Sequence, residues 1–357
     1  MDNKYILAIN PGSTSTKITL FLNEKKIVST NISHSSEEIS KFPKIIDQKD
    51  FRSKIVLDFL EKNSFNPEHL SAVVGRGGLL SAMKSGTYIV NQKMIDYLAT
   101  NSLEHASNLG AIIADSIAKL ANVNAFIVDP VVVDEMDETA KITGIPEIKR
   151  KSIWHALNQK SAGREAAKLL NKKYKDCNLI IVHLGGGISV AAHKKGVAVD
   201  VNNALNGDGP FSPERAGSIP AWSLVELVKS NKYTFPEIKK MITGKGGIVA
   251  HLKVNDIREV EKRISENDKK AELIYNAMAY NISKSIGAMG PVLKGDIDAI
   301  VLTGGIAYSK KFVDLIKSRV EFLARALVLP GEDEMKALAD GVLRVLNGKE
   351  KAKIWKN

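Results

Sequence analysis

Two short segments of similar pattern lie about half a chain apart, and this repeat constrains the fold more than any other feature. Residues 6–16 read ILAINPGSTST and residues 180–190 read IIVHLGGGISV. Each is an apolar run with high β-propensity, then a turn of glycine, serine or threonine, then a second run. At an offset of 174 residues (180 − 6), Gly12 matches Gly186. Both segments continue through a charged turn into another strand, which predicts a duplicated unit that opens with an antiparallel meander, rather than two unrelated hairpins.

Strands and helices alternate through the rest of the chain, which predicts an α/β protein. A third strand followed by glycines, AIVLTGGIAYS, spans 299–309, and the helix SKKFVDLIKSRVEFLARA is expected after it. Strands are also expected at 70–74 and 124–129. Further helices are expected at 47–62, 108–121, 158–172, 268–288 and 333–346.

The length of 357 residues favours two domains, and the segment 143–152, TGIPEIKRKS, has the composition of a crossing between them. A single cysteine, Cys177, excludes an internal disulfide. No apolar run approaches the roughly 20 residues that span a bilayer. The first residues lack the pattern of a signal peptide. We therefore expect a cytoplasmic protein with no membrane partner.

The chain carries a formal charge of +11, from 51 basic and 40 acidic residues. Its lysines come as scattered doublets without a basic arm, a zinc-ligand spacing or an RNA-stacking aromatic pattern. We therefore expect no nucleic-acid partner. The same positive field would attract anionic small molecules.

The first glycine turn is rich in groups that could hold an anion. From Asn10 to Lys17 it offers an amide, four hydroxyls, main-chain N–H groups and a lysine. It is not a Walker A loop, because no second glycine precedes Lys17, and it leads into a strand rather than a helix. The alternative is a polar hairpin turn. We expect a phosphate site that includes Asn10, Ser13, Ser15 and Lys17.

The second turn is almost bare of side chains. His183 and Leu184 precede Gly185, Gly186 and Gly187, and three glycines allow close approach of a polyanion. A further contact is expected at Gly304 and Gly305. Two such turns from duplicated domains, with the late strand–glycine–helix segment, predict a nucleotide bound in a cleft between the domains.

These features together resemble the actin–hexokinase–Hsp70 superfold and, within it, the acetate and butyrate kinase family, with the butyrate kinases the nearer match. The resemblance runs from residue 9 to residue 341. It is carried by INPGSTSTK, VVGRGG, EHASNLGA, IWHALNQK, VHLGGGISVA, NGDGPFSPERAGSIP, VLTGGIA and PGEDEMKALADG.

The resemblance implies two ribonuclease H-like domains with mixed five-stranded sheets flanked by helices. Residues 1–150, completed by about 333–357, would form an acyl-kinase domain, and 151–332 a nucleotide-binding domain. It implies reversible, in-line phosphorylation of a short-chain carboxylate such as butyrate or isobutyrate, with ATP/ADP and Mg²⁺ as cofactors. It also implies a homo-oligomer, a dimer or higher.

An acyl kinase must bring two anions together, and a carboxylic acid is already ionised at pH 7, so no base is needed to activate it. Arginines are therefore expected at the site. Arg76, in Gly-Arg-Gly-Gly after an apolar strand, and Arg215, in SPERAGSIP, are the candidates. Each could instead form a surface ion pair. By resemblance both match arginines that hold the acyl group and the transferring phosphoryl group.

Four more positions take roles by resemblance. His155 matches a histidine that contacts the transferring phosphoryl group, although beside Trp154 it could be a packed core residue. Asp129, at the end of a strand, matches an aspartate that positions the reacting groups, although it could cap a turn. Asn10 matches a residue near the metal and Glu334 is the candidate metal-related carboxylate, although an acidic start also suits a helix dipole.

Two departures from acetate kinase favour a longer acyl chain: Leu157 stands where that enzyme has threonine, and Gly186 where it has asparagine. A pocket separates neighbouring acids only about 10- to 200-fold per carbon, so butyrate, isobutyrate and propionate are not ranked. The alternatives are a sugar or polyol kinase of the same superfold, with Asp129 as base, and a nucleotide-gated regulatory protein.

Overall fold

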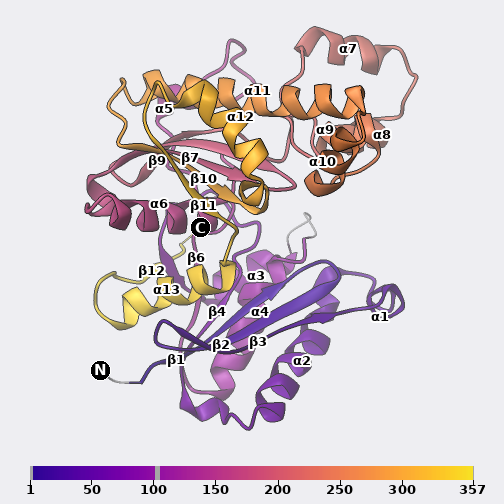
Figure 1. The fold of residues 1–357 in the computed structure, drawn as a ribbon. Helices are drawn as coiled ribbons and strands as arrows, with labels where there is room; N and C mark the ends of the chain where they lie inside the picture. Colours follow the sequence, from indigo (N-terminus) through magenta and orange to yellow (C-terminus); the bar gives the residue numbers. More distant parts are fainter. Residues whose placement is uncertain (1–2, 101–104, 357) are drawn as a thin grey trace. The chain divides into compact units, whose positions relative to one another are not determined.

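The computed structural model describes residues 3–100 and 105–356. It divides into two compact units, residues 1–133 with 333–357 (unit 1) and residues 134–332 (unit 2) (Figure 1). The units change at Val133 and Asp134, ahead of the segment expected as the crossing. One reason is that Asp137 N–H already donates to the Val199 carbonyl, 2.9 Å away, in the sheet of unit 2. The domain ranges and the cleft expected from sequence stay predictions.

Within the described residues, the sheet of unit 1 has seven strands in the order β12-β5-β6-β4-β1-β2-β3. Its strands are β1 (Tyr5–Pro11), β2 (Ser15–Leu22), β3 (Lys25–Ser33), β4 (Leu70–Gly75), β5 (Thr87–Ile89), β6 (Ala125–Val128) and β12 (Lys353–Ile354). β1, β2 and β3 form the antiparallel meander expected from sequence, whereas β4 pairs parallel to β1 and β6 parallel to β4.

Helices cover both faces of this sheet. They are α1 (Ser36–Ser40), α2 (Lys49–Lys62), α3 (Gln92–Thr100), α4 (Asn108–Leu120) and α13 (Glu334–Leu346), with the 3₁₀ turns η1 (Ile45–Gln48) and η2 (Pro67–His69). Leu7, Ile9 and Ile127 join the core beneath α2 and α4. Because alternate strand residues face opposite sides, Val128 points away from that core. It meets α13 instead, where a Cβ on Gly341 would lie 2.6 Å from Val128.

Within its described residues, unit 2 contains a sheet of five strands in the order β11-β10-β7-β8-β9. The strands are β7 (Asn178–Leu184), β8 (Ile188–Lys194), β9 (Val197–Val201), β10 (Ala299–Gly304) and β11 (Ala326–Pro330). Here too the first three strands are an antiparallel meander, and the later two pair parallel to β7 and β10.

Both faces of the second sheet are buried, because Ile180 and Val182 of β7 pack in one core cluster while Leu179 and Ile181 pack in another. α11 and α12 contribute to the first cluster and α6 to the second. The helices are α5 (Glu138–Lys141), α6 (Ala156–Leu169), α7 (Ala221–Lys229), α8 (Phe235–Thr243), α9 (Gly247–Leu252), α10 (Ile257–Ser265), α11 (Lys269–Val292) and α12 (Lys310–Val320), with η3 (Tyr174–Asp176) and η4 (Gly305–Tyr308).

The two sheets share one topology, since β3-β2-β1-β4-β6 and β9-β8-β7-β10-β11 correspond strand for strand. The predicted duplication is therefore confirmed. β2 begins at Ser15 and β8 at Ile188, an offset of 173 residues (188 − 15), so the alignment at 174 is shifted by one. α6, the second helix after β6, packs on the sheet of unit 2, and α13, the helix that follows β11, packs on the sheet of unit 1.

Two expectations about local structure were wrong. The first sheet has seven strands rather than five, because β5 pairs antiparallel to β6 and β12 adds beside β5. The helix expected over 309–326 ends at Val320, and the chain then forms β11. The apolar run ALVLP pairs parallel to β10 there, because the open edge of β10 offers backbone partners that a longer helix would leave unused.

Candidate active site

The first glycine turn lies between β1 and β2, and its main chain is held by an internal hydrogen bond and by hydrogen bonds from α2. Gly12 N–H donates to the Ser15 carbonyl, 2.8 Å away. The Arg52 guanidinium of α2 donates to the Ser15 carbonyl at 2.8 Å and to the Ser13 carbonyl at 3.3 Å. The side chains of Ser13 and Thr14 are left exposed on the outer side of the turn. The turn is therefore a fixed, hydroxyl-bearing surface, as a phosphate site requires.

Arg52 is a residue that the sequence analysis missed. It is 0% exposed, and its remaining contacts are with Gln48 at 3.0 Å and the Thr16 hydroxyl at 3.1 Å. Burial lowers the pKa of the Arg52 guanidinium to about 10, so it stays charged at neutral pH. The buried face of its helix is Arg52, Val56, Phe59 and Leu60. Residues 52, 56 and 59 fall on one helical face, but an arginine at that spacing does not by itself indicate burial.

His34 braces the same turn from the end of the meander. The His34 ring Nε2 lies 2.8 Å from the Thr16 hydroxyl, and the main-chain N–H of His34 donates to the Thr14 carbonyl at 2.8 Å. Burial, then the charge of Arg52, lowers the pKa of His34. The sequence analysis assigned this histidine no role.

Arg76, Glu334 and Asn10 are brought together within unit 1. Glu334, the first residue of α13, accepts a hydrogen bond from Asn10 Nδ2 at 2.6 Å and forms an ion pair with Arg76. Both charged side chains are mostly buried, at 14% exposure for Arg76 and 24% for Glu334. Asp333 caps α13 by accepting from Lys336 N–H, which leaves Glu334 in the first turn facing β1. Of the three acidic residues of this segment, Glu334 is the one joined to Asn10 and Arg76.

Glycines around Arg76 let three segments approach closely. A Cβ on Gly75 would lie 2.0 Å from the Gly110 carbonyl oxygen, and one on Gly110 would lie 2.2 Å from that of Arg76. A Cβ on Gly77 would lie 2.5 Å from the side chain of Pro130. The Gly-Arg-Gly-Gly motif is thus needed for packing β4 against the start of α4, and it presents the arginine where those segments meet.

His105 is a third residue that the sequence analysis did not single out, although it lies in the EHASNLGA motif. Its Nδ1 accepts from Ser107 N–H at 3.2 Å. Burial, then the charge of Arg76, lowers the pKa of His105. A neutral ring with its proton on Nε2 follows, because Nδ1 is an acceptor.

Asp129 follows β6 and is held in a sparsely populated backbone conformation, with φ of 40°. Its Oδ1 accepts from the Ser85 hydroxyl at 2.6 Å and from Gly86 N–H at 2.8 Å. The side chain is 1% exposed. A non-glycine residue with positive φ in a buried loop is a form of strain that clusters at functional sites. Lys17, by contrast, lies exposed on β2.

The second glycine turn lies between β7 and β8 and is held by the loop that carries Arg215. The Ser212 hydroxyl donates to the Gly186 carbonyl at 2.6 Å. A Cβ on Gly187 would lie 1.9 Å from Arg215 Nη1, so only glycine lets this guanidinium lie against the turn. Arg215 Nη1 donates to the Ala204 carbonyl, and burial lowers the pKa of Arg215. Among the described residues, its buried Nε has no hydrogen-bond partner, which leaves a donor for an anion.

The third glycine segment closes onto the second turn. Gly304 has φ of 91°, and a Cβ there would lie 2.4 Å from the Leu184 carbonyl oxygen. Gly304 and Gly331 exchange hydrogen bonds of 3.1 and 2.9 Å between their main chains. A Cβ on Gly305 would meet nothing within 4 Å. Close packing therefore explains Gly304, and Gly305 faces open space.

His155 and His183 stack on one another, with ring centroids 3.9 Å apart and an interplanar angle of 17°. His155 Nδ1 lies 2.9 Å from the Ser189 hydroxyl. His183 Nδ1 lies 2.8 Å from Asn158 Oδ1, and its Nε2 lies 3.6 Å from a carboxylate oxygen of Glu332. Both rings belong to unit 2, where they lie beside the glycine turn: a Cβ on Gly185 would be 2.8 Å from His183 Nε2.

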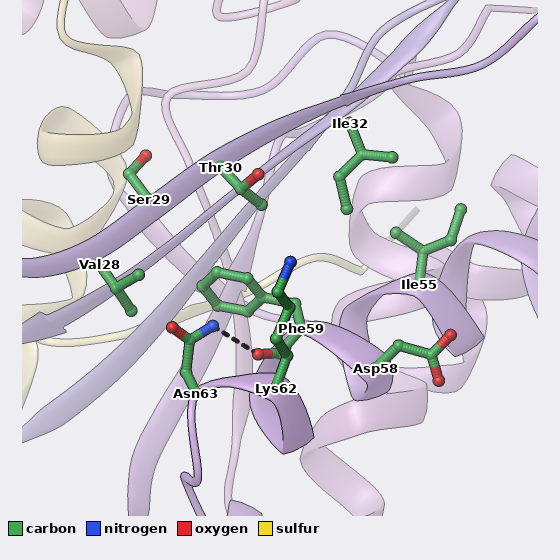
Figure 2. Close-up of a pocket in the computed structure, with 9 residues that line it drawn as sticks. All are labelled: Val28, Ser29, Thr30, Ile32, Ile55, Asp58, Phe59, Lys62 and Asn63. Carbon is green, nitrogen blue, oxygen red and sulfur yellow. Dashed lines mark hydrogen bonds between the residues drawn. The ribbon is translucent and has the colours of Figure 1, made fainter.

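A hollow of about 380 Å³ elsewhere in unit 1 is lined by none of the predicted site residues. Figure 2 shows its side chains, which come from β3 and from α2 with Asn63 just beyond it. Asn63 Nδ2 donates to the Phe59 carbonyl at 2.7 Å. None of the residues that line the hollow belongs to a glycine turn.

The repeated strand order and the paired glycine turns define a protein of the actin/hexokinase-like class. Among solved structures, acetate kinase from Porphyromonas gingivalis has a TM-score of 0.80 at 20% identity, over 96% of this chain and 100% of that one. A propionate kinase from Francisella tularensis has a TM-score of 0.75 at 18% identity, over 95% of this chain and 98% of that one. These structures support the fold.

The chain belongs to the acetokinase family, whose sequence model matches residues 148–327. Butyrate kinase 1 and butyrate kinase 2 of Clostridium acetobutylicum are each 53% identical to it over 352 residues. That alignment spans 98% of this chain and 99% of each relative. In the part of the chain that the structure describes, no helix combines the length and the hydropathy needed to cross a membrane.

Proposed function

We propose that this protein is a butyrate kinase, which transfers the γ-phosphoryl group of ATP to butyrate or a related short straight or branched carboxylate and also runs in reverse. The observation that carries the proposal is the 53% identity to two butyrate kinases over nearly the whole chain. The family makes the chain a kinase that uses ATP and ADP with a carboxylate as acceptor.

The nucleotide phosphates are assigned to the glycine turns. Main-chain N–H groups at residues 186 and 187 and the exposed hydroxyls of the first turn offer donors to phosphate oxygens, whereas Gly185 N–H donates to the Gly187 carbonyl. The half-buried Arg215 adds a positive charge beside Gly187. His183, Gly304 and Gly305 complete the proposed nucleotide site, with Asn10, Ser13, Ser15 and Lys17 from the first turn.

The chemistry needs charge neutralisation rather than proton abstraction, because the acceptor carboxylate is already ionised. Arg76, Arg215 and His155 are the proposed donors to the acyl carboxylate and to the transferring phosphoryl group. Asp129 is proposed to position the reacting groups. Excluding water would protect ATP and the acyl phosphate from hydrolysis.

Mg²⁺ fits the residues present only as a partner of the phosphates. Within the described ranges, no group of three or more His, Cys, Asp or Glu side chains is placed to hold a metal ion. Glu334 and Asn10 supply one carboxylate and one amide. This small oxygen set suits an ion that keeps most of its coordination for phosphate oxygens and water. When bound, Mg²⁺ would neutralise phosphate charge.

The homo-oligomer remains part of the proposal. α7 exposes Trp222 and Val225, at 71% and 53%, and large exposed apolar side chains are typical of surfaces that an assembly covers. Light scattering on the purified protein measures the mass of the assembly, and a monomer of 38.9 kDa would contradict it. A reducing cytoplasm is the proposed setting, and the thiol of Cys177 is buried.

Trapping of acyl phosphate as the hydroxamate tests the function directly. The protein is incubated with ATP, Mg²⁺ and acids from acetate to valerate, isobutyrate included. We expect the signal to peak at the four-carbon acids. A protein that forms no acyl phosphate from any acid, but consumes ATP with sugars, would be a hydroxyl kinase instead.

A further inference from the structure

A chain of buried hydrogen bonds in unit 2 ends at His155. The Tyr174 hydroxyl lies 2.7 Å from His193 Nδ1, and His193 Nε2 lies 3.0 Å from Gln159 Oε1. Gln159 Nε2 lies 2.8 Å from the Ser189 hydroxyl, which lies 2.9 Å from His155 Nδ1. The three middle residues are each 0% exposed. The hydrogen bonds among these three residues are therefore shielded from water, whereas those to Tyr174 and His155 are partly buried.

Gln159 fixes which partner donates in each hydrogen bond of this series. Its Nε2 is also 3.0 Å from the main-chain carbonyl oxygen of Ser189, which can only accept. The amide nitrogen must therefore point towards Ser189, and Oε1 must point towards His193. Because Oε1 can only accept, His193 Nε2 carries a proton.

The protonation of His193 in turn determines which partner donates in the hydrogen bond to Tyr174. The pKa of His193 is lowered well below the ordinary value, first by burial and then by the charges of Lys160 and Arg164, so the ring is neutral. A neutral imidazole has one N–H, and that N–H is on Nε2. His193 Nδ1 therefore accepts, and the Tyr174 hydroxyl donates to it.

The Ser189 hydroxyl determines which partner donates in the hydrogen bond to His155. The hydroxyl oxygen of Ser189 accepts from Gln159 Nε2, so its single proton must go to another acceptor. Within the described residues, the other group that reaches this hydroxyl is His155 Nδ1. The hydroxyl therefore donates to Nδ1, because otherwise a fully buried proton would have no acceptor.

We propose that this relay holds His155 in the tautomer with its proton on Nε2, so that the ring presents a fixed Nε2–H donor to the transferring phosphoryl group. The contact of this donor with the transferring phosphoryl group rests on the proposed function, whereas the tautomer does not. The stack with His183 holds the plane of the ring, so the donor is oriented as well as protonated. A donor fixed before the reaction needs no reorganisation during it. Ser189, Gln159 and His193 are then positioning residues, since they act through His155.

The tautomer can be read in the resting protein by long-range proton–nitrogen NMR on protein labelled with ¹⁵N-histidine. Signals of His155 are assigned by their loss in His155→Asn. The wild-type protein is expected to show Nε2 protonated and Nδ1 unprotonated. A proton on Nδ1 in the wild type would overturn the proposal.

Two substitutions test the cause. Ser189→Ala removes the donor to Nδ1, so a mixture of tautomers is expected, with kcat lowered about 10-fold and KM for butyrate nearly unchanged. Gln159→Glu offers only acceptors, so the Ser189 hydroxyl turns towards the new carboxylate and the His155 proton is expected to move to Nδ1. Ser189→Thr keeps the hydroxyl and should keep the wild-type tautomer. The comparison of Ser189→Ala with Ser189→Thr therefore tests the proposal even if the Gln159→Glu protein does not fold.

Ser318→Ala is the matched control, because this serine is exposed on α12 and its hydroxyl donates to the Leu315 carbonyl of its own helix. It should change neither the NMR pattern nor kcat. A Ser189→Ala protein with the wild-type tautomer would refute the relay. The expected NMR result without acyl phosphate from any acid would instead refute the proposed function and leave the relay standing.

Discussion

Arg52 donates a hydrogen bond of 2.8 Å from its buried guanidinium to the main-chain oxygen of Ser15, in the turn between the first two strands. The same side chain reaches the Ser13 carbonyl and the Thr16 hydroxyl. A side chain with no exposure thus determines the shape of a turn whose outer side chains face solvent. The turn is held by the helix beneath it as well as by its own main-chain hydrogen bond and by His34.

Arg52→Lys is therefore expected to weaken nucleotide binding more than it weakens folding. An ammonium group keeps the charge but cannot reach several acceptors in the fork geometry of a guanidinium. We expect KM for ATP to rise about 10-fold, and KM for butyrate to change little. Initial rates at varied ATP measure the effect.

Lys54→Ala, on the exposed side of the same helix, is the control for Arg52→Lys. If Arg52→Lys raised both KM values equally, or neither, the turn would not be a phosphate site held by Arg52.

Glu334→Gln separates the ion pair from the fold. The ion pair with Arg76 and the hydrogen bond from Asn10 give Glu334 its position at the start of α13. The amide keeps the shape and removes the charge, so acyl phosphate formation should fall about 100-fold and the Mg²⁺ concentration needed for half-maximal rate should rise. Both are measured with the hydroxamate assay. An unchanged Mg²⁺ requirement would count against a metal-related role.

Gly187→Ala is expected to act on Arg215 rather than on the sheet. The added Cβ would lie 1.9 Å from Arg215 Nη1, and the far end of that side chain can move whereas the strands cannot. We expect kcat to fall about 10-fold or more while the unfolding midpoint stays near that of the wild type. In an Arg215→Ala background the glycine substitution should cost little further activity, because the two act through one group.

Gly287→Ala in α11 is the control for Gly187→Ala, since a Cβ there meets nothing within 4 Å. Additive losses in Gly187→Ala and Arg215→Ala would show that the turn and the arginine act separately.

Stability is expected to fall as the solution is made acidic. His193 and His34 both have pKa values below the ordinary value, chiefly because of burial. Below about pH 6.5 the unfolded chain takes up protons at these rings before the folded protein does. Their contribution to the free energy of unfolding is thus fully present above about pH 6.5 and is lost as the pH falls towards the folded-state pKa values.

Urea unfolding at about pH 7.5 and about pH 5 measures this loss of stability. His34→Gln should reduce the difference between the two pH values, because it removes one of the titrating rings. A midpoint that does not change, or that rises in acid, would contradict the expectation.

The glycine turns and the meanders could be predicted because they are local patterns: apolar runs of strand length separated by residues that favour turns. The two short strands at one end of the first sheet could not, since Thr87–Ile89 and Lys353–Ile354 are too short to show a period and find their partners only in the folded chain. β11 was hidden because its apolar run continues the pattern of α12.

The proposed site was predictable where a residue stands in a motif and not where it acts through another residue. Arg76 and Arg215 stood out among glycines and prolines, whereas Arg52 lies in an ordinary amphipathic helix. Gln159 and His193 were equally hidden, because their hydrogen bonds join α6 to β8, and no spacing along the chain reports that contact. Burial of polar side chains is a property of the folded chain, which is why the supporting residues required the structure.

Asp129→Asn separates the strained backbone from the charge. Asparagine tolerates positive φ better than most residues, so the conformation at φ of 40° should persist. Its amide oxygen can still accept from Ser85 and Gly86, as Oδ1 of the aspartate does. The unfolding midpoint should therefore change little.

If Asp129 positions the reacting groups through its charge, acyl phosphate formation should fall about 100-fold in this folded protein. Asp129→Ala would lose both the turn and the activity, so only the asparagine variant distinguishes the two roles. Full activity in Asp129→Asn would leave Asp129 with the structural role of closing the turn that follows β6.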